Sequence, residues 1–118
     1  MTTITRFVLH TKSHNLTIET NQQEQWQLSY EYLRVFSPAQ IASKQVIGNK
    51  KLVQLNTIEN VGKHGFRLNF DDNHSCIFTI DDFVSLTTNQ ERNWQKYEEL
   101  LSSNKMTREA KIDIVNLS

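Results

Sequence analysis

The first thirty residues alternate between apolar and polar side chains. Phe7 and Leu9 fall on one face of the first segment, and Leu16 and Ile18 fall on one face of the second. A period of two residues is typical of β-strands, and the short polar stretches between segments favour tight turns. The pattern therefore predicts an antiparallel meander of three strands. The predicted strands are residues 3–10, 15–20 and 25–28, and the predicted turns are residues 12–15 and 21–24.

After the third strand the apolar spacing changes to that of a helix, with Tyr30 and Leu33 on one face of a single turn. A stronger local signal follows at Ser37. Serine is a favoured N-cap, proline is tolerated at the first helical position, and a glutamine three residues after the cap can complete a capping box. The sequence therefore predicts a short helix from Pro38 to about Lys44.

The strand pattern returns in the middle of the chain. Its first segment has irregular apolar spacing, which predicts a strand with a bend or a bulge. Phe66, Leu68 and Phe70 then alternate with polar residues, and the Asp and Asn residues that follow tolerate the positive φ of a hairpin turn. The predicted strands are residues 52–61, 66–70 and 75–80, separated by turns at residues 62–65 and 71–74.

The last third of the chain has helical spacing. Asp81 and Asp82 can cap a helical turn, and Thr88 with Glu91 has the spacing of a second capping box. A longer helix is predicted beyond them, because apolar residues recur there on one helical face. That face consists of Trp94, Tyr97 and Leu101.

These elements together predict a single α+β domain. It has a mainly antiparallel sheet, two short helices in the middle and one longer helix near the C-terminus. The domain is predicted over residues 1–104. The polar residues 105–118 form a C-terminal tail, either as a short docked segment or as a frayed end.

The composition narrows the functional classes. The chain has 118 residues, 13 Lys and Arg, 13 Asp and Glu, and one Cys. One cysteine excludes an internal disulfide and a Cys-only zinc site, and the zero net charge disfavours nucleic-acid binding. No apolar run approaches the roughly 20 residues of a membrane span, and the N-terminus lacks the pattern of a signal peptide. We therefore expect a cytoplasmic protein with no membrane segment.

Charge is uneven along the chain despite the zero sum. Residues 31–67 contain six basic and two acidic residues, whereas residues 71–99 contain seven acidic and two basic ones. The two halves either neutralise each other on a solvated surface or form a bipolar surface that docks a protein partner.

The hairpin turn at residues 71–74 and its neighbours contain the side chains best suited to bind a metal. If Asp72 and Asn73 form a two-residue loop, Asp71 lies opposite His74, and both share a sheet face with Cys76. Carboxylate, imidazole and thiolate are all ligands of zinc or iron, so a metal site is one interpretation. The alternative is a cross-strand Asp–His pair beside a half-buried thiol.

No catalytic constellation accompanies this turn. A thiolate–imidazole pair of Cys76 and His74 would lack both an orienting third group and an oxyanion hole. The three glycines do not fit a phosphate-binding loop. We therefore expect no enzymatic activity and no cofactor, with zinc or iron at the hairpin as the alternative.

Two stretches resemble a known family. Residues 33–39 (LRVFSPA) are similar to its leucine–arginine…serine–proline signature, and residues 61–74 (VGKHGFRLNFDDNH) are similar to its valine–glycine…phenylalanine-x-aspartate-glycine-histidine signature. The family is that of gamma-butyrobetaine hydroxylase-like N-terminal domains, small domains of unknown function. The resemblance covers roughly residues 3–100. This chain departs from the family at Lys63–Gly65, Asn73, Cys76 and Ile80.

The resemblance implies a zinc site that this chain cannot complete. In the long hydroxylases the related domain binds zinc through three cysteines and a histidine and precedes an iron-dependent catalytic domain. The cysteine positions fall here at Ser37, Ala39 and Ala42, and only the histidine position, His74, is retained. Hydroxyl and methyl groups do not replace thiolates, so we expect neither this zinc site nor hydroxylase activity.

The resemblance also suggests a context. Family members occur fused to iron–sulfur carrier proteins, which implies a role near iron–sulfur cluster assembly. We therefore expect a non-enzymatic adaptor module that binds a protein partner, such as an iron–sulfur carrier, with its oligomeric state left open. The alternative is a metal-binding protein that uses Asp71, His74 and Cys76. The predicted binding surface consists of Leu33, Arg34, Ser37, Lys63, His64 and Arg67.

Overall fold

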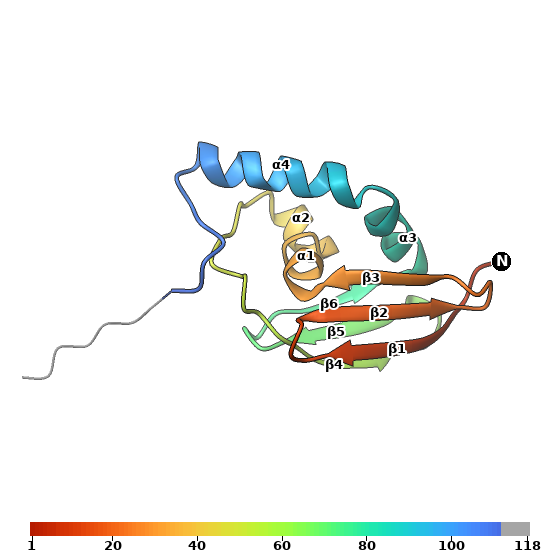
Figure 1. The fold of residues 1–118 in the computed structure, drawn as a ribbon. Coiled ribbons are helices and arrows are strands. Elements are labelled where there is room, and N and C mark those ends of the chain that lie inside the picture. The colour runs from red at the N-terminus through yellow and green to blue at the C-terminus, as the bar shows by residue number, and fades with distance from the viewer. Residues whose placement is uncertain (112–118) are drawn as a thin grey trace, which may run out of the picture.

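The computed structural model describes residues 1–111 and has an α+β fold of two three-stranded antiparallel sheets with helices beside them (Figure 1). The strands are β1 (Ile4–His10), β2 (Asn15–Thr20), β3 (Gln25–Ser29), β4 (Leu55–Asn60), β5 (Phe66–Phe70) and β6 (Ser75–Phe78). The helices are α1 (Tyr30–Val35), α2 (Pro38–Ser43), α3 (Ile80–Thr88) and α4 (Gln90–Ser103), and a short 3-10 helix, η1, spans Gly62–His64.

The first sheet, in the order β1-β2-β3, confirms the predicted meander. Phe7 of β1 and Trp26 of β3 both pair with Ile18 of the central strand. Leu16, Ile18 and Leu28 are completely buried. The alternating pattern therefore placed the inner face of the central strand correctly, because burial on one face is what imposes the period of two.

The second sheet, in the order β4-β5-β6, also follows the predicted strands. β4 begins at Leu55, three residues later than predicted, because the chain turns at residues 51–52. The predicted irregularity is present as a register shift between Leu55 and Thr57 in the pairing with β5. A bulge of this kind explains why the apolar residues of β4 do not alternate cleanly.

The helix starts follow their capping residues, with two corrections. Ser37 caps α2 by accepting a hydrogen bond from the backbone N–H of Gln40, as predicted. α3 is capped by Thr79, whose capping-box partner is Asp82, so Asp82 lies inside the first turn instead of preceding the helix. The capping box predicted at Thr88 is absent because α3 extends through that residue.

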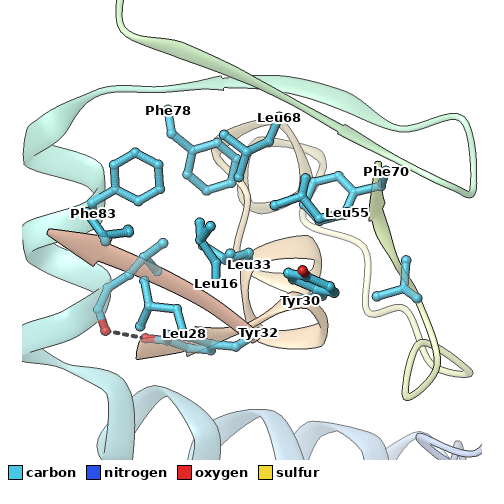
Figure 2. Packing of buried hydrophobic residues seen from close by; sticks show 13 residues of the cluster. Leu16, Leu28, Tyr30, Tyr32, Leu33, Leu55, Leu68, Phe70, Phe78 and Phe83 are labelled. Carbon is cyan, nitrogen blue, oxygen red and sulfur yellow. Dashed lines mark hydrogen bonds between the residues drawn. The ribbon is translucent and has the colours of Figure 1, made fainter. Parts of the chain in front are cut away.

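The two sheets and the helices share one apolar core. Figure 2 shows side chains from both sheets, from α1 and from α3 meeting there, with Phe78 and Phe83 stacked. The hydroxyl of Tyr32 donates to the backbone oxygen of Leu86 at 2.6 Å. A smaller cluster of Val35, Tyr97 and Leu101 holds α4 against α1, which confirms the predicted apolar face of α4.

Residues 105–111, here called the C-terminal strap, follow α4 and run back along the loop before β4 (Figure 1). The backbone N–H groups of Asn49 and Lys51 donate to the carbonyl oxygens of Thr107 and Arg108 at 2.8 and 3.0 Å. Gly48 permits this approach, because a Cβ atom there would lie 2.5 Å from the Thr107 oxygen. The strap is therefore a docked segment, and residues 112–118 of the predicted tail lie outside the described residues.

Within residues 1–111, the longest helix is too short and too polar to cross a membrane.

Candidate functional site

The β5–β6 hairpin differs from its predicted register by one residue. Leu68 pairs with Cys76, and the N–H of Phe70 donates to the carbonyl oxygen of His74 at 2.9 Å. The loop therefore has three residues, and the last of them, Asn73, has φ of 67°. A three-residue loop that ends in the left-handed conformation is a common alternative to the two-residue turn. The predicted pairing of Asp71 opposite His74 is wrong for this reason.

The shift in register separates the three proposed metal ligands. Asp71 accepts a hydrogen bond from the backbone N–H of Gln54 at 3.1 Å. The Cys76 thiol accepts one from the backbone N–H of Ala39 at 3.4 Å, and His74 turns toward α2. Across the described part of the chain, no three His, Cys, Asp or Glu side chains are grouped to hold a metal ion.

Of the positions that the family resemblance assigns to zinc, Ser37 and His74 lie in contact. The Nε2 atom of His74 lies 2.8 Å from the Ser37 hydroxyl, and Ala39 contacts the Cys76 thiol through its backbone N–H. The hydroxyl of Ser37 is completely buried and already caps α2, and Ala39 offers only a methyl group. These residues do not fit a zinc ion, because one imidazole and one thiol replace a set of three thiolates and an imidazole.

A charged network beside His74 ties α1 to the hairpin loop. Arg34 and Lys50 each place a nitrogen 2.7 Å from the same carboxylate oxygen of Asp72. Arg34 also donates to the side-chain oxygen of Gln40 at 2.8 Å. Burial alone would raise the pKa of Asp72, but the hydrogen bonds from Lys50 and Arg34 outweigh it and lower that pKa. The two cations share this one carboxylate, so the network links α1 and residue 50 to the hairpin loop and carries one net positive charge.

His74 is held as a neutral imidazole. Burial lowers the pKa of His74, and the positive charges of Arg34 and Lys50 lower it further, although Asp72 opposes them. The ring also packs against Phe70, with centroids 5.9 Å apart. His74 therefore joins the hairpin to α2 through Ser37 in its uncharged form.

The predicted binding surface is not one surface. Leu33 and Ser37 have no exposed area and Arg34 is 9 % exposed, so this half of the prediction is wrong. Lys63 and His64 are exposed in η1, at the end of β5 opposite the hairpin loop, and Arg67 pairs with Glu59 at 2.9 Å. The leucine–arginine…serine signature is a core motif, because its side chains pack inside the domain.

A groove that the sequence analysis did not predict lies between α2, α3, α4 and residues 44–47. Its volume is about 580 Å³, and its inner wall includes Phe36, Val46 and Ile47, which pack on the smaller apolar cluster. Ile41 and Leu100 also line it, with 56 % and 38 % of their surfaces exposed. We call it the α2–α4 groove.

The charged side chains that line the α2–α4 groove are all basic. They are Lys44, Arg92 and Lys96, and among the described residues no Asp or Glu lines the groove. Arg92 and Lys96 are one helical turn apart on α4, with Leu100 one turn further. The spacing of these residues can be read from the sequence and could have predicted a basic edge on the helix. The two cations lie within a predominantly acidic stretch, so a count of charges over that stretch does not reveal them.

Comparisons with known proteins agree with the resemblance. The profile described as "Gamma-butyrobetaine hydroxylase-like, N-terminal" matches residues 7–83. Two proteins solved by NMR in solution are 30 % and 32 % identical to this chain, with TM-scores of 0.80 and 0.81; they align with 99 % and 100 % of this chain and with 98 % and 93 % of their own. A crystal structure of a protein of unknown function from Acidithiobacillus ferrooxidans, of the DUF971 family, is 24 % identical and has a TM-score of 0.63 over 71 % of this chain and 91 % of its own. No curated protein matches.

Proposed function

The chain belongs to the gamma-butyrobetaine hydroxylase-like N-terminal family, and we propose that this member is a non-enzymatic protein-binding module that holds an acidic, amphipathic segment of a partner in the α2–α4 groove. The observation that carries the proposal is the combination of an apolar inner wall with lining charges of a single sign.

The apolar part of the groove provides the contact area. Ile41 and Leu100 are among the most exposed large apolar side chains of the described residues, and both line this one groove. Exposed apolar side chains that are scattered singly need no explanation, but a contiguous set beside a cavity marks an interaction site. A helix with apolar residues on one face fits such a groove.

The charged part of the groove selects the partner. None of the ion pairs formed within residues 1–111 uses Lys44, Arg92 or Lys96; Arg92 donates only to the neutral side chain of Asn89. Elsewhere Arg34, Arg67 and Arg108 each have a carboxylate partner. Cations that have no carboxylate partner within residues 1–111 favour a segment that carries Asp or Glu beside its apolar residues, because complementary charge steers binding and sets its orientation.

An iron–sulfur carrier protein is the first class of partner that we propose to test, because the family resemblance suggests that context. The groove itself requires only an acidic, amphipathic segment. Partner identity and groove chemistry are therefore separate parts of the proposal, and the groove can be tested first.

The test is peptide binding measured by fluorescence anisotropy. The probe is a labelled helical peptide with leucine at positions i, i+3, i+4 and i+7 and glutamate beside them, and the control peptide has glutamine in place of every glutamate. We expect Lys96→Glu to weaken binding of the acidic peptide about tenfold or more, which corresponds to about 1.4 kcal/mol. Added salt should weaken the binding of the acidic peptide more than that of the neutral one.

Two further variants locate the site. Leu100→Ser should weaken both peptides, because it removes exposed apolar area that both use. Lys63→Glu is the matched control, since Lys63 is also exposed but does not line the groove, and it should leave binding unchanged. Equal losses for Lys63→Glu and Lys96→Glu, or no preference for the acidic peptide, would show that the groove does not select its ligand in the way proposed.

A further inference from the structure

A buried carboxylate on α1 is paired with a side chain from the C-terminal strap. Glu31 is only 4 % exposed, and its two oxygens accept hydrogen bonds from Arg108 at 2.9 and 2.8 Å. The guanidinium carbon of Arg108 also lies 4.9 Å from the centroid of the Trp94 ring. A bidentate carboxylate contact combined with an aromatic face is specific for a guanidinium group.

The two side chains of this contact differ in how much of their surface is exposed. The Glu31 side chain is 5 % exposed and belongs to a helix packed in the core, whereas the Arg108 side chain is 37 % exposed and belongs to the strap. The neighbours of Arg108 in the strap, Thr107 and Glu109, are exposed as well. The acceptor is therefore built into the fold, and the donor is supplied by a segment on the surface.

The strap adds a second element of recognition, which lies in its backbone. The N–H groups of Asn49 and Lys51 donate to the carbonyl oxygens of Thr107 and Arg108. The side chain of Asn49 donates to the next carbonyl oxygen, that of Glu109, at 2.7 Å. The strap is bent at Arg108 and Glu109, so the site holds an arginine at a bend in a peptide whose carbonyl oxygens accept hydrogen bonds from the loop.

A cavity of about 470 Å³ continues beside the contact. Glu31, Trp94 and Arg108 line it, and so do the polar side chains of Ser13 and Gln90. The strap therefore leaves space beside the guanidinium group that a larger ligand can occupy.

We propose that Glu31 and Trp94, with the backbone of residues 49–51, form an arginine-peptide site, that Arg108 is its internal ligand, and that an arginine at a bend in an exposed segment of a partner protein exchanges with it. This site is separate from the α2–α4 groove, and it stands or falls independently of the proposed function.

Because Arg108 already occupies the site, it competes with any peptide that is added from outside. A tethered segment acts at an effective concentration of about the millimolar range, so an outside peptide competes poorly with the intact strap. Arg108→Ala in the full-length protein removes the competing guanidinium group and leaves Glu31 unpaired, which lowers stability because a buried charge then has no partner.

The experiment adds peptides to the Arg108→Ala protein and follows the NMR signal of the Trp94 indole together with the melting temperature. The probe is the acetylated, amidated peptide Met-Thr-Arg-Glu-Ala, the sequence of residues 106–110. We expect saturable binding of this peptide and a higher melting temperature. The same peptide with lysine in place of arginine should bind at least about tenfold more weakly, because lysine cannot make the bidentate contact. Free L-arginine should also bind more weakly than the peptide, because it lacks the flanking carbonyl groups.

The matched control is the double variant Glu31→Gln/Arg108→Ala, which should not respond to the arginine peptide. Equal response of the double variant, equal binding of the lysine peptide, or no binding to a folded Arg108→Ala protein would overturn the proposal. Tighter binding of free L-arginine than of the peptide would overturn the peptide part of it.

Hydrogen exchange of the unmodified protein gives an answer even if Arg108→Ala does not fold. The amides of Asn49 and Lys51 are bonded to the strap, so an exchangeable strap predicts that they exchange much faster than the core amide of Ile18. Protection of all three amides to the same degree would mean that the strap opens only with global unfolding, and the exchange mechanism would be wrong.

Discussion

Ser37→Ala is the substitution that best tests how the hairpin is joined to the helices. The Ser37 hydroxyl makes two contacts, since it accepts from the N–H of Gln40 at the start of α2 and lies 2.8 Å from Nε2 of His74. The side chain has no exposed area, so water has no access to replace either contact. The substitution therefore removes a helix cap and an inter-element hydrogen bond together.

The expected magnitude is the sum of these two losses. Loss of a serine N-cap costs about 1 kcal/mol, and leaving the nitrogen of the half-buried imidazole without its Ser37 partner costs about 1–3 kcal/mol. Ser37→Ala should therefore lower the free energy of unfolding by about 2–4 kcal/mol. Ser29→Ala is the matched control, because Ser29 caps α1 through the N–H of Tyr32 alone, and it should cost about 1 kcal/mol.

The assay is urea unfolding at pH 8, followed by tryptophan fluorescence and circular dichroism. His74 is neutral at this pH in both the folded and the unfolded protein, so protonation does not contribute. A double-mutant cycle with His74→Ala isolates the Ser37–His74 contact and should give a coupling energy of about 1 kcal/mol or more. If Ser37→Ala costs no more than Ser29→Ala and the coupling energy is below about 0.5 kcal/mol, the hydrogen bond does not join the two elements.

Three further predictions concern the backbone, the core and pH. Gly65 has φ of 114°, and a Cβ atom there would lie 2.3 Å from a backbone oxygen of β6, so Gly65→Ala should cost more than about 3 kcal/mol in urea unfolding. Gly62→Ala, at φ of 67° in open space, should cost only about 1–2 kcal/mol, and equal costs would contradict the steric argument. Tyr32→Phe removes the 2.6 Å bond to the backbone oxygen of Leu86 and should cost about 1–3 kcal/mol by the same assay. The pKa of His74 is lowered in the folded protein, so the unfolded protein binds more protons below about pH 6.5 and stability falls as the pH decreases from 7 toward 5. Urea unfolding across this range should show a smaller pH dependence for His74→Gln.

Local patterns predicted the elements of this fold because each pattern has a local physical cause. The meander around Leu16 and Ile18 follows from alternation, since one face of β2 is buried in the core. The start of α2 follows from the capping chemistry of Ser37 and Pro38, which acts within one helical turn. Six of the thirteen residues of the main core cluster lay on the predicted apolar faces: Leu16, Ile18, Tyr30, Leu33, Leu68 and Phe70.

The candidate site was harder to predict because it depends on contacts between distant segments. The register of the hairpin depends on whether its loop, which ends at Asn73, has two or three residues. A shift of one residue changes which side chains face each other. Arg34 was assigned to the binding surface with its neighbours in the family-like segment, yet its partners come from residues 40 and 72. Charge reveals that a side chain needs a partner, but not whether the partner is solvent or another segment.

Three polar links form the junction between the β5–β6 hairpin and helices α1 and α2. Ser37 with His74 and Ala39 with Cys76 link the start of α2 to the hairpin, and Arg34 with Asp72 links α1 to it. Each of the two neutral links is worth about 1 kcal/mol. Two of the three links contain a titratable partner whose pKa is lowered, which means that acid weakens them in sequence, first through His74 and then through Asp72. The junction is therefore expected to depend on pH in two steps, with the upper step set by one imidazole.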